Sequence, residues 1–204
     1  MEYVIYMLTK AQIENALKIC LDSKAQYPSA CNSVETILIN KNIANEFLKK
    51  LYSLFKENEI KMNGDEEVKK ILSDIGIVKD WHREYGDKEV SLKIVDNLEE
   101  AYKHINKYSS HHTDSIISEN KENIEKFMTF VDSANVYSNV STRFSDGFRY
   151  GFGAEVGIST NKTHARGPVG LEGLTIYKYK LFGNYQIVDD YVSHKSSFKH
   201  KRIK

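Results

Sequence analysis

The sequence predicts an α/β protein built on a mostly parallel sheet. Short runs of apolar and β-branched residues alternate with segments whose apolar residues recur at helical spacing. Neither an internal repeat nor a low-complexity linker interrupts this alternation. Strands that alternate with amphipathic helices form parallel pairs, because each helix carries the chain back to the start of the next strand.

The first strand and helix show the pattern clearly. Residues 3–8 predict a short buried strand, and a helix is expected from Thr9, with Gln12 placed to close a capping box. Four side chains fall on one face of that helix: Ile13, Ala16, Leu17 and Cys20. Cys20 is therefore expected in the core.

The following elements continue the alternation. Strands are expected at residues 36–39, 59–62, 90–94, 113–118 and 134–140. Helices are expected after Asn42 and Asp65, and over residues 97–108 and 121–131. Asn42 predicts an N-cap, and the pair Asn63-Gly64 predicts a turn.

Residues 143–174 differ from everything before them because seven glycines crowd into this segment. Periodic burial does not explain such a density, so we expect the backbone to turn tightly there or to approach another group closely. Residues 174–182 then predict one more strand. Its place near the end of the chain suggests an edge strand that could pair with another subunit.

Composition narrows the function classes. The 204 residues suit one large domain, or one domain with an appendage, and 29 basic against 28 acidic residues give a net charge of +1. Without a basic stripe, a nucleic-acid binder is not expected. Two cysteines imply no disulfide framework and favour a reducing compartment. We see no membrane-spanning run and no secretory signal, so we expect a cytoplasmic protein, with a mitochondrial location also open.

Five stretches carry a resemblance to a known family: YPSACNSVETILI, REYGDKEVSLKIVDN, YSSHHTDSIISE, VDSANVYSNVSTRFSDGFRYGFGAEVGIST and HARGPVGLEGLTIYKYKLFG. Together they closely resemble γ-glutamyl phosphate reductase, also called glutamate-5-semialdehyde dehydrogenase, a branch of the aldehyde dehydrogenase superfamily. The later segment VDDYVSHKSSFKH looks more like the reductase part of the bifunctional pyrroline-carboxylate synthase. The resemblance runs from about residue 3 to residue 200.

The resemblance implies a three-layer, aldehyde-dehydrogenase-like catalytic domain over residues 1–160. Residues 161–204 would be a C-terminal oligomerisation segment and tail that help to form a dimer. Family members carry an upstream half with most of the NADPH-binding domain, and this sequence lacks a counterpart. A glutamate kinase, fused upstream or separate, is a further partner that the resemblance leaves open.

The implied reaction is the NADPH-dependent reduction of L-glutamyl 5-phosphate to L-glutamate 5-semialdehyde in proline biosynthesis. The nucleophile of the family's S-A-C-N motif falls on Cys31. A thiolate can displace phosphate and leave a thioester that accepts hydride, whereas an oxygen ester would accept it poorly. The alternative is a catalytically inert module that serves dimer formation. An aldehyde dehydrogenase of another specificity is disfavoured by the glycine-rich blocks.

Further candidate site residues follow from the substrate and the cofactor. For the substrate we expect Asn32, which could also only form the turn, and Ser141, Thr142, Arg143 and Asp146. Arg143 would bind the α-carboxylate and Asp146 the ammonium group, unless the two only brace the loop.

For the cofactor, Glu84 and Tyr85 match the place where aldehyde dehydrogenases hold the nicotinamide ribose, and a solvated surface charge is the alternative. His164, Arg166 and Gly167 could meet phosphate or a partner subunit. The histidine spacing predicts no metal site.

Overall fold

The structure is a computed structural model that describes residues 2–6 and 13–198 of the chain. The expected capping box at Thr9 and Gln12 lies outside these residues. The chain divides after Leu174 into two compact units, and the first of them contains both sheets.

The first unit is built on a seven-stranded sheet in the order β4-β3-β5-β2-β1-β6-β7. The strands are β1 (Glu2–Tyr6), β2 (Val34–Asn40), β3 (Lys61–Gly64), β4 (Gly76–Ile77), β5 (Glu89–Val95), β6 (Thr113–Ile117) and β7 (Asn135–Ser138). Every neighbouring pair is parallel. The predicted parallel sheet is therefore confirmed.

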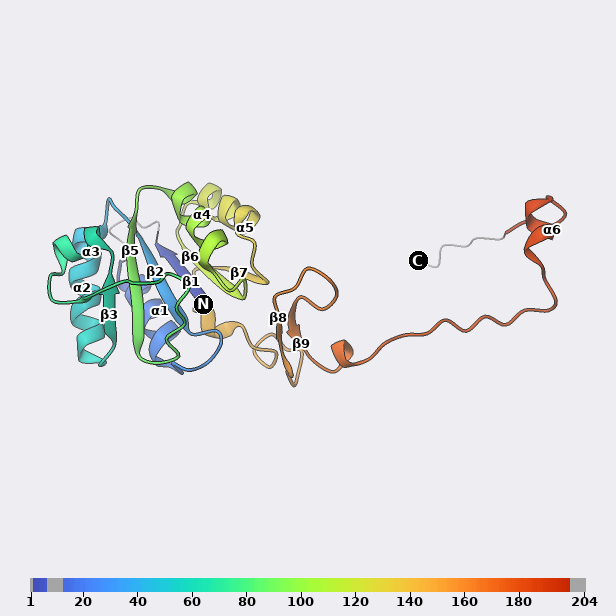
Figure 1. The fold of residues 1–204 in the computed structure, drawn as a ribbon, viewed down its shortest axis with the longest axis horizontal. Coiled ribbons are helices and arrows are strands. Elements are labelled where there is room, and N and C mark those ends of the chain that lie inside the picture. The colour runs from blue at the N-terminus through green and yellow to red at the C-terminus, as the bar shows by residue number, and fades with distance from the viewer. Residues whose placement is uncertain (1, 7–12, 199–204) are drawn as a thin grey trace. The chain divides into compact units, whose positions relative to one another are not determined.

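Helices cover both faces of this sheet (Figure 1). They are α1 (Ile13–Ala25), α2 (Ala44–Glu57), α3 (Glu66–Ile71), α4 (Leu98–Tyr108) and α5 (Lys121–Phe130). The connections through α1, α2 and α3 step toward the β4 edge, whereas those through α4 and α5 step toward the β7 edge. Right-handed crossovers place helices that step in opposite directions on opposite faces. The expected three-layer architecture is confirmed.

The two faces have separate hydrophobic cores. Side chains of α1, α2 and α3 form one core with the sheet, and it includes Cys20 and Phe47, both fully buried. Side chains of α4 and α5 form the other core, around Ile105 and Phe127. The expectation that Cys20 is a core residue is confirmed.

Two local signals were interpreted wrongly. Asn42 does not cap α2, because Ile43 occupies the N-cap position without a side-chain hydrogen bond. Asn63 and Gly64 form no turn but lie in β3, where Asn63 pairs with Ser91. Asp65 does cap α3 as expected, since its Oδ1 accepts from the N–H of Val68 at 2.9 Å.

The glycine-rich segment ends in a two-stranded antiparallel hairpin, β8 (Gly157–Ser159) and β9 (Gly167–Val169). Gly167 has φ +87°, a conformation that L side chains rarely adopt. A Cβ on Gly170 would lie only 2.9 Å from the carbonyl oxygen of Ala154. The expected tight turns and close approaches are present at these positions. The expected domain boundary after residue 160 falls in the hairpin loop and stays a prediction.

The described part of the second unit, residues 175–198, contains one short helix, α6 (Val188–Val192). The strand expected at residues 174–182 does not form within the chain: Leu174 lies in the short helix η3 (Glu172–Leu174), and the following residues pair with no described strand. Ile176 and Leu181 are 99% and 97% exposed. A strand needs a hydrogen-bonded neighbour, so pairing with another subunit stays a prediction. No helix within the described part of the chain is long and apolar enough to cross a membrane.

Candidate active site around Cys31

Cys31 lies in the loop between α1 and β2, and its side chain is exposed. Two backbone hydrogen bonds shape this loop: the N–H of Ala30 donates to Tyr27 at 3.2 Å, and the N–H of Ser33 donates to Ala30 at 2.9 Å. The thiol therefore lies on a tight double turn that leads into a central strand. It is open to solvent, in contrast to the buried Cys20.

Residues far along the chain support the Cys31 loop. Beyond β7, segment 141–145 packs against the loop through buried polar contacts. Thr142 Oγ1 donates to the carbonyl of Asn32 at 2.8 Å, and Asn32 Nδ2 donates to the carbonyl of Ser145 at 2.6 Å. Ser23, in the last turn of α1, completes the contact, because its hydroxyl donates to Ser141 Oγ at 3.0 Å and accepts from the N–H of Thr142 at 3.3 Å.

Three of the expected substrate residues are thus brought next to Cys31, but as buried groups. Asn32, Ser141 and Thr142 are 4%, 5% and 0% exposed. Asn32 Oδ1 is buried and has no hydrogen-bond partner among the described residues, which leaves an acceptor that a donor could satisfy. Their role in substrate binding stays a prediction.

Arg143 follows on the short helix η2 (Thr142–Phe144) and is nearly buried. Its Nε donates to Gln26 Oε1 at 2.8 Å, and its guanidinium carbon lies 5.8 Å from the centre of the Tyr27 ring. Burial lowers the pKa of Arg143, and the charge of Arg149 lowers it further, while Cys31 and Asp146 act in the opposite direction. Through Gln26 and Tyr27, Arg143 is held against the start of the loop that carries Cys31.

The expected brace between Arg143 and Asp146 takes a different form. Asp146 forms its ion pair with Arg149, at 3.9 Å, and its Oδ1 accepts from the N–H groups of Phe148 and Arg149 at 3.0 and 3.1 Å. The Arg149 guanidinium also donates to the carbonyl of Arg143. We missed Arg149 in the sequence, although its spacing of three residues from Asp146 suits a capped turn.

A buried ion pair lies beside the Cys31 loop. Lys24 Nζ donates to Glu35 Oε1 at 3.0 Å and to the carbonyl of Asp87 at 3.1 Å. Burial lowers the pKa of Lys24 and raises the pKa of Glu35, and the opposite charge of the partner offsets part of each change. Lys24 was missed in the sequence. The signal was present, because Lys24 lies four residues after Cys20 on the apolar face of α1.

The expected cofactor residues lie in the loop that enters β5. Tyr85 anchors this loop: its N–H donates to Glu35 Oε2 at 3.0 Å, and its hydroxyl lies 2.9 Å from Ser91 Oγ. Glu84 is exposed. Because β2 and β5 are parallel neighbours, their N-terminal ends lie side by side. The loops that carry Cys31 and Glu84 therefore enter the sheet at the same end of the strands.

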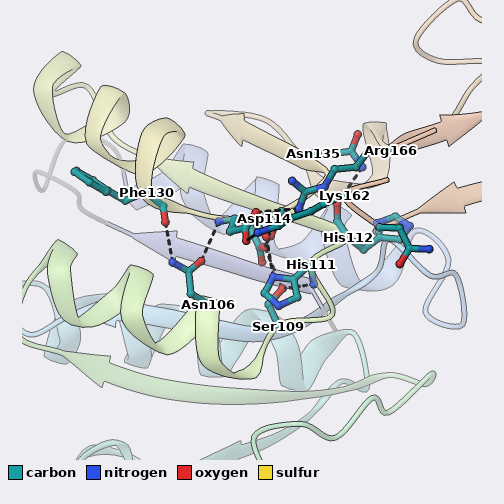
Figure 2. Close-up of polar contacts among 12 residues, drawn as sticks. Asn106, Ser109, His111, His112, Asp114, Phe130, Asn135, Lys162 and Arg166 are labelled. Carbon is teal, nitrogen blue, oxygen red and sulfur yellow. Dashed lines mark hydrogen bonds and ion pairs between the residues drawn. The ribbon is translucent and has the colours of Figure 1, made fainter. Parts of the chain in front are cut away.

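The HARGPVG block contacts the loop between α5 and β7 through Arg166 and Asp132, and Figure 2 labels Arg166 and the neighbouring Lys162. Arg166 Nη2 donates to Asp132 Oδ1 at 3.1 Å, and Lys162 forms a second ion pair with the same carboxylate. These contacts, led by the one from Lys162, lower the pKa of Asp132. Whether His164, Arg166 and Gly167 meet phosphate or a partner subunit stays open. The described residues include no cluster of three or more His, Cys, Asp or Glu side chains that could hold a metal ion.

The parallel three-layer α/β unit, with Cys31 on the loop before a central strand, is a fold that solved aldehyde dehydrogenases share. A propionaldehyde dehydrogenase from Clostridium phytofermentans shares this fold, with a TM-score of 0.57 at 14% identity over 82% of this chain and 47% of that one. No family model matches the chain.

Proteins with higher sequence identity to the chain narrow the comparison to one enzyme family. The chain is 84% identical over 202 residues to the gamma-glutamyl phosphate reductase of Brachyspira hyodysenteriae, matching 98% of this chain and 47% of that protein. The enzyme of the same name from Prochlorococcus marinus strain MIT 9312 is 53% identical, over 98% of this chain and 46% of the relative. The crystal structure of gamma-glutamyl phosphate reductase from Thermotoga maritima superposes with a TM-score of 0.85 at 39% identity, over 91% of this chain and 45% of that one.

The resemblance to gamma-glutamyl phosphate reductase expected from the motifs is confirmed. The chain spans about half the length of the curated relatives that it matches. The finer likeness of residues 188–200 to pyrroline-carboxylate synthase stays a prediction.

Proposed function

We propose that the chain provides the nucleophile and part of the substrate site for the NADPH-dependent reduction of L-glutamyl 5-phosphate to L-glutamate 5-semialdehyde and phosphate. The observation that carries the proposal is the exposed thiol of Cys31 on a loop that buried hydrogen bonds hold in place. The similarity of the chain to gamma-glutamyl phosphate reductases supports the same reaction. In a protein with this activity, the reaction belongs to proline biosynthesis in a reducing compartment such as the cytoplasm.

The Cys31 thiolate would attack the acyl carbon of the substrate. A C–S bond forms, the C–O bond to the phosphoryl group breaks, and phosphate leaves with its electron pair. The resulting thioester carbonyl accepts a hydride, after which the thiolate departs and the aldehyde is released. Arg143, held against Gln26 and Tyr27 of the same loop, would favour the thiolate through its positive charge.

The remaining residues would bind and orient the substrate. Arg143 is the candidate for the α-carboxylate, because a guanidinium can hold a carboxylate through two hydrogen bonds. Asp146 is the candidate for the ammonium group, and its pairing with Arg149 fixes its position. Asn32, Ser141 and Thr142 would hold the Cys31 turn against segment 141–145 while the substrate reacts.

Bound NADPH would supply the hydride. Glu84 and Tyr85 fit such a cofactor, because the Glu84 carboxylate is exposed on a loop whose backbone is anchored beside the Cys31 loop. An exposed carboxylate can accept hydrogen bonds from ribose hydroxyls.

Assembly is the second candidate role, and the apolar residues after Leu174 favour it. Tyr179 and Phe182 are 90% and 91% exposed, which a chain that acts alone rarely tolerates over such a stretch. A homo-oligomer in which these residues are covered would combine both roles. NADPH titration of the natural protein that carries this sequence separates a catalytic protein from one that only assembles.

The test is Cys31→Ser in the natural protein that carries this sequence. We expect NADPH formation from pyrroline-5-carboxylate, phosphate and NADP to fall at least about a thousandfold, because serine is a poor nucleophile without a dedicated base. Circular dichroism should show an unchanged fold. Cys20→Ala is the matched control and should keep its activity. Turnover close to that of the unsubstituted protein in Cys31→Ser would remove Cys31 from the mechanism.

A further inference from the structure

The buried ion pair of Lys24 and Glu35 is not used by the mechanism above, although the side chains are 0% and 3% exposed. A buried ion pair is a weak source of stability, because removing two charges from water offsets most of their attraction. The lowered pKa of Lys24 and the raised pKa of Glu35 agree with a dominant cost of burial. The pair therefore calls for a reason other than stability.

The first part of that reason is its place along the chain. Lys24 lies in the last turn of α1 and Glu35 at the start of β2, so the 3.0 Å contact between them joins the two ends of the Cys31 loop. The pair closes the base of this loop.

The second part is what each partner does with its remaining hydrogen-bonding capacity. Lys24 Nζ also donates to the carbonyl of Asp87 at 3.1 Å, and Glu35 Oε2 accepts from the N–H of Tyr85 at 3.0 Å. Both contacts go to backbone atoms of the loop that carries Glu84. The pair thus holds the Cys31 loop and segment 84–87 together.

We propose that Lys24 and Glu35 are positioning residues that fix segment 84–87, and with it the Glu84 carboxylate, relative to Cys31. The proposal rests on the proposed function only in that Glu84 meets the cofactor; the coupling of the two loops stands on the contacts themselves. The ion pair acts through these two loops.

The experiment removes the pair without leaving a charge buried alone. In Lys24→Met/Glu35→Leu, the Tyr85 N–H loses its acceptor, so we expect its hydrogen exchange to become at least about tenfold faster, because exchange follows local opening. The exchange of the Leu38 amide, in the middle of β2, should not change. In the reductase assay we expect the KM for NADP to rise about tenfold, while the KM for pyrroline-5-carboxylate changes less than about twofold, since only uniform binding of the cofactor is lost.

The matched control is Lys103→Met/Glu99→Leu, which makes the same substitutions in an exposed pair on α4. It should change neither the Tyr85 exchange nor either KM. Unchanged Tyr85 exchange in Lys24→Met/Glu35→Leu would overturn the proposal, as would equal changes in both KM values. The reductase assays use the natural protein that carries this sequence; if that protein shows no turnover without substitution, the proposed function fails and the Tyr85 exchange alone decides the coupling. Should the double variant fail to fold, Lys24→Leu/Glu35→Met, which also removes both charges and the acceptor of the Tyr85 N–H, is measured in the same way, with the same outcomes deciding.

Discussion

At the scale of single residues, the Cys31 turn depends on neutral hydrogen bonds from a distant segment. Thr142 is fully buried, and its hydroxyl donates to the carbonyl of Asn32, the residue next to the nucleophile. Thr142→Val keeps the shape of the side chain but leaves that carbonyl without its donor. We expect the free energy of unfolding to fall by about 1–3 kcal/mol, because a buried polar group loses its partner.

Urea denaturation of the chain measures this loss. Thr163→Val, at an exposed position, is the control and should change the free energy of unfolding by less than about 0.5 kcal/mol. An equally small effect of Thr142→Val would mean that this hydrogen bond does not hold the turn.

The same scale shows what the sequence could reveal about the site. The S-A-C-N motif singled out Cys31 in the sequence, and the side chain of Cys31 is exposed. Ser23 and Lys24 were not predicted, because their partners lie on β2 and beyond β7, and no local pattern encodes such contacts. Lys24 could have been found as a charged residue on an otherwise apolar helix face.

At the scale of elements, exposed ion pairs hold the hairpin β8–β9 to Asp132, in the loop between α5 and β7. The Asp132 carboxylate forms ion pairs with both Arg166 and Lys162, and its side chain is 40% exposed. Asp132→Ala should therefore change the free energy of unfolding by less than about 1 kcal/mol. The hairpin loop should nevertheless open more often, so we expect trypsin to cleave after Lys162 or Arg166 severalfold faster.

Mass spectrometry of timed digests measures the cleavage rate. Asp96→Ala is the control, because Asp96 pairs with Lys41 on the surface away from the hairpin. If both variants were cleaved at the same rate as the unsubstituted chain, the ion pairs would not hold the hairpin.

The predicted secondary structure was wrong at positions where packing between elements overrides the local sequence signal. Asn63-Gly64 is a frequent turn pair, but here a Cβ on Gly64 would lie 2.7 Å from Val68 Cγ1. The glycine thus allows α3 to pack closely against β3, and the chain stays extended. Strand β4 has only two residues, too few to give a periodic signal. The segment after Leu174 is apolar enough for a strand, but pairing cannot be read from one chain.

At the scale of the whole molecule, the order of strands determines where the site lies. Successive connections step from β1 toward β4 and then, after β5, toward β7, so each face of the sheet receives its own set of helices. The alternation in the sequence predicted the class of this fold, whereas strand order follows from crossovers over several strands, which periodicity does not encode. Because this order makes β2 and β5 neighbours, the loops before them lie side by side at the N-terminal ends of the strands. Cys31 and Glu84 are therefore on neighbouring loops.

Two buried histidines in the half of the sheet covered by α4 and α5 make stability depend on pH. Burial, aided by Lys93 and Lys107, lowers the pKa of His104 to about 3, and burial lowers the pKa of His112 to about 4. Their pKa values in the folded chain lie below the ordinary 6.5, so the unfolded chain binds protons first as the pH falls. Their contribution to stability is complete above about pH 6.5 and is lost progressively toward about pH 4.

Between pH 6 and pH 5 each histidine should therefore lower the free energy of unfolding by about 1 kcal/mol. His104→Gln removes one titrating group, and we expect its loss of stability between these two pH values to be smaller by about that 1 kcal/mol. Urea denaturation at both pH values gives the difference, which is independent of any constant effect of the substitution. Equal losses in both proteins would show that His104 takes up its proton in the folded chain, and that the ring contacts with Trp81 and Tyr108, at 4.9 and 4.6 Å between centroids, do not keep it neutral.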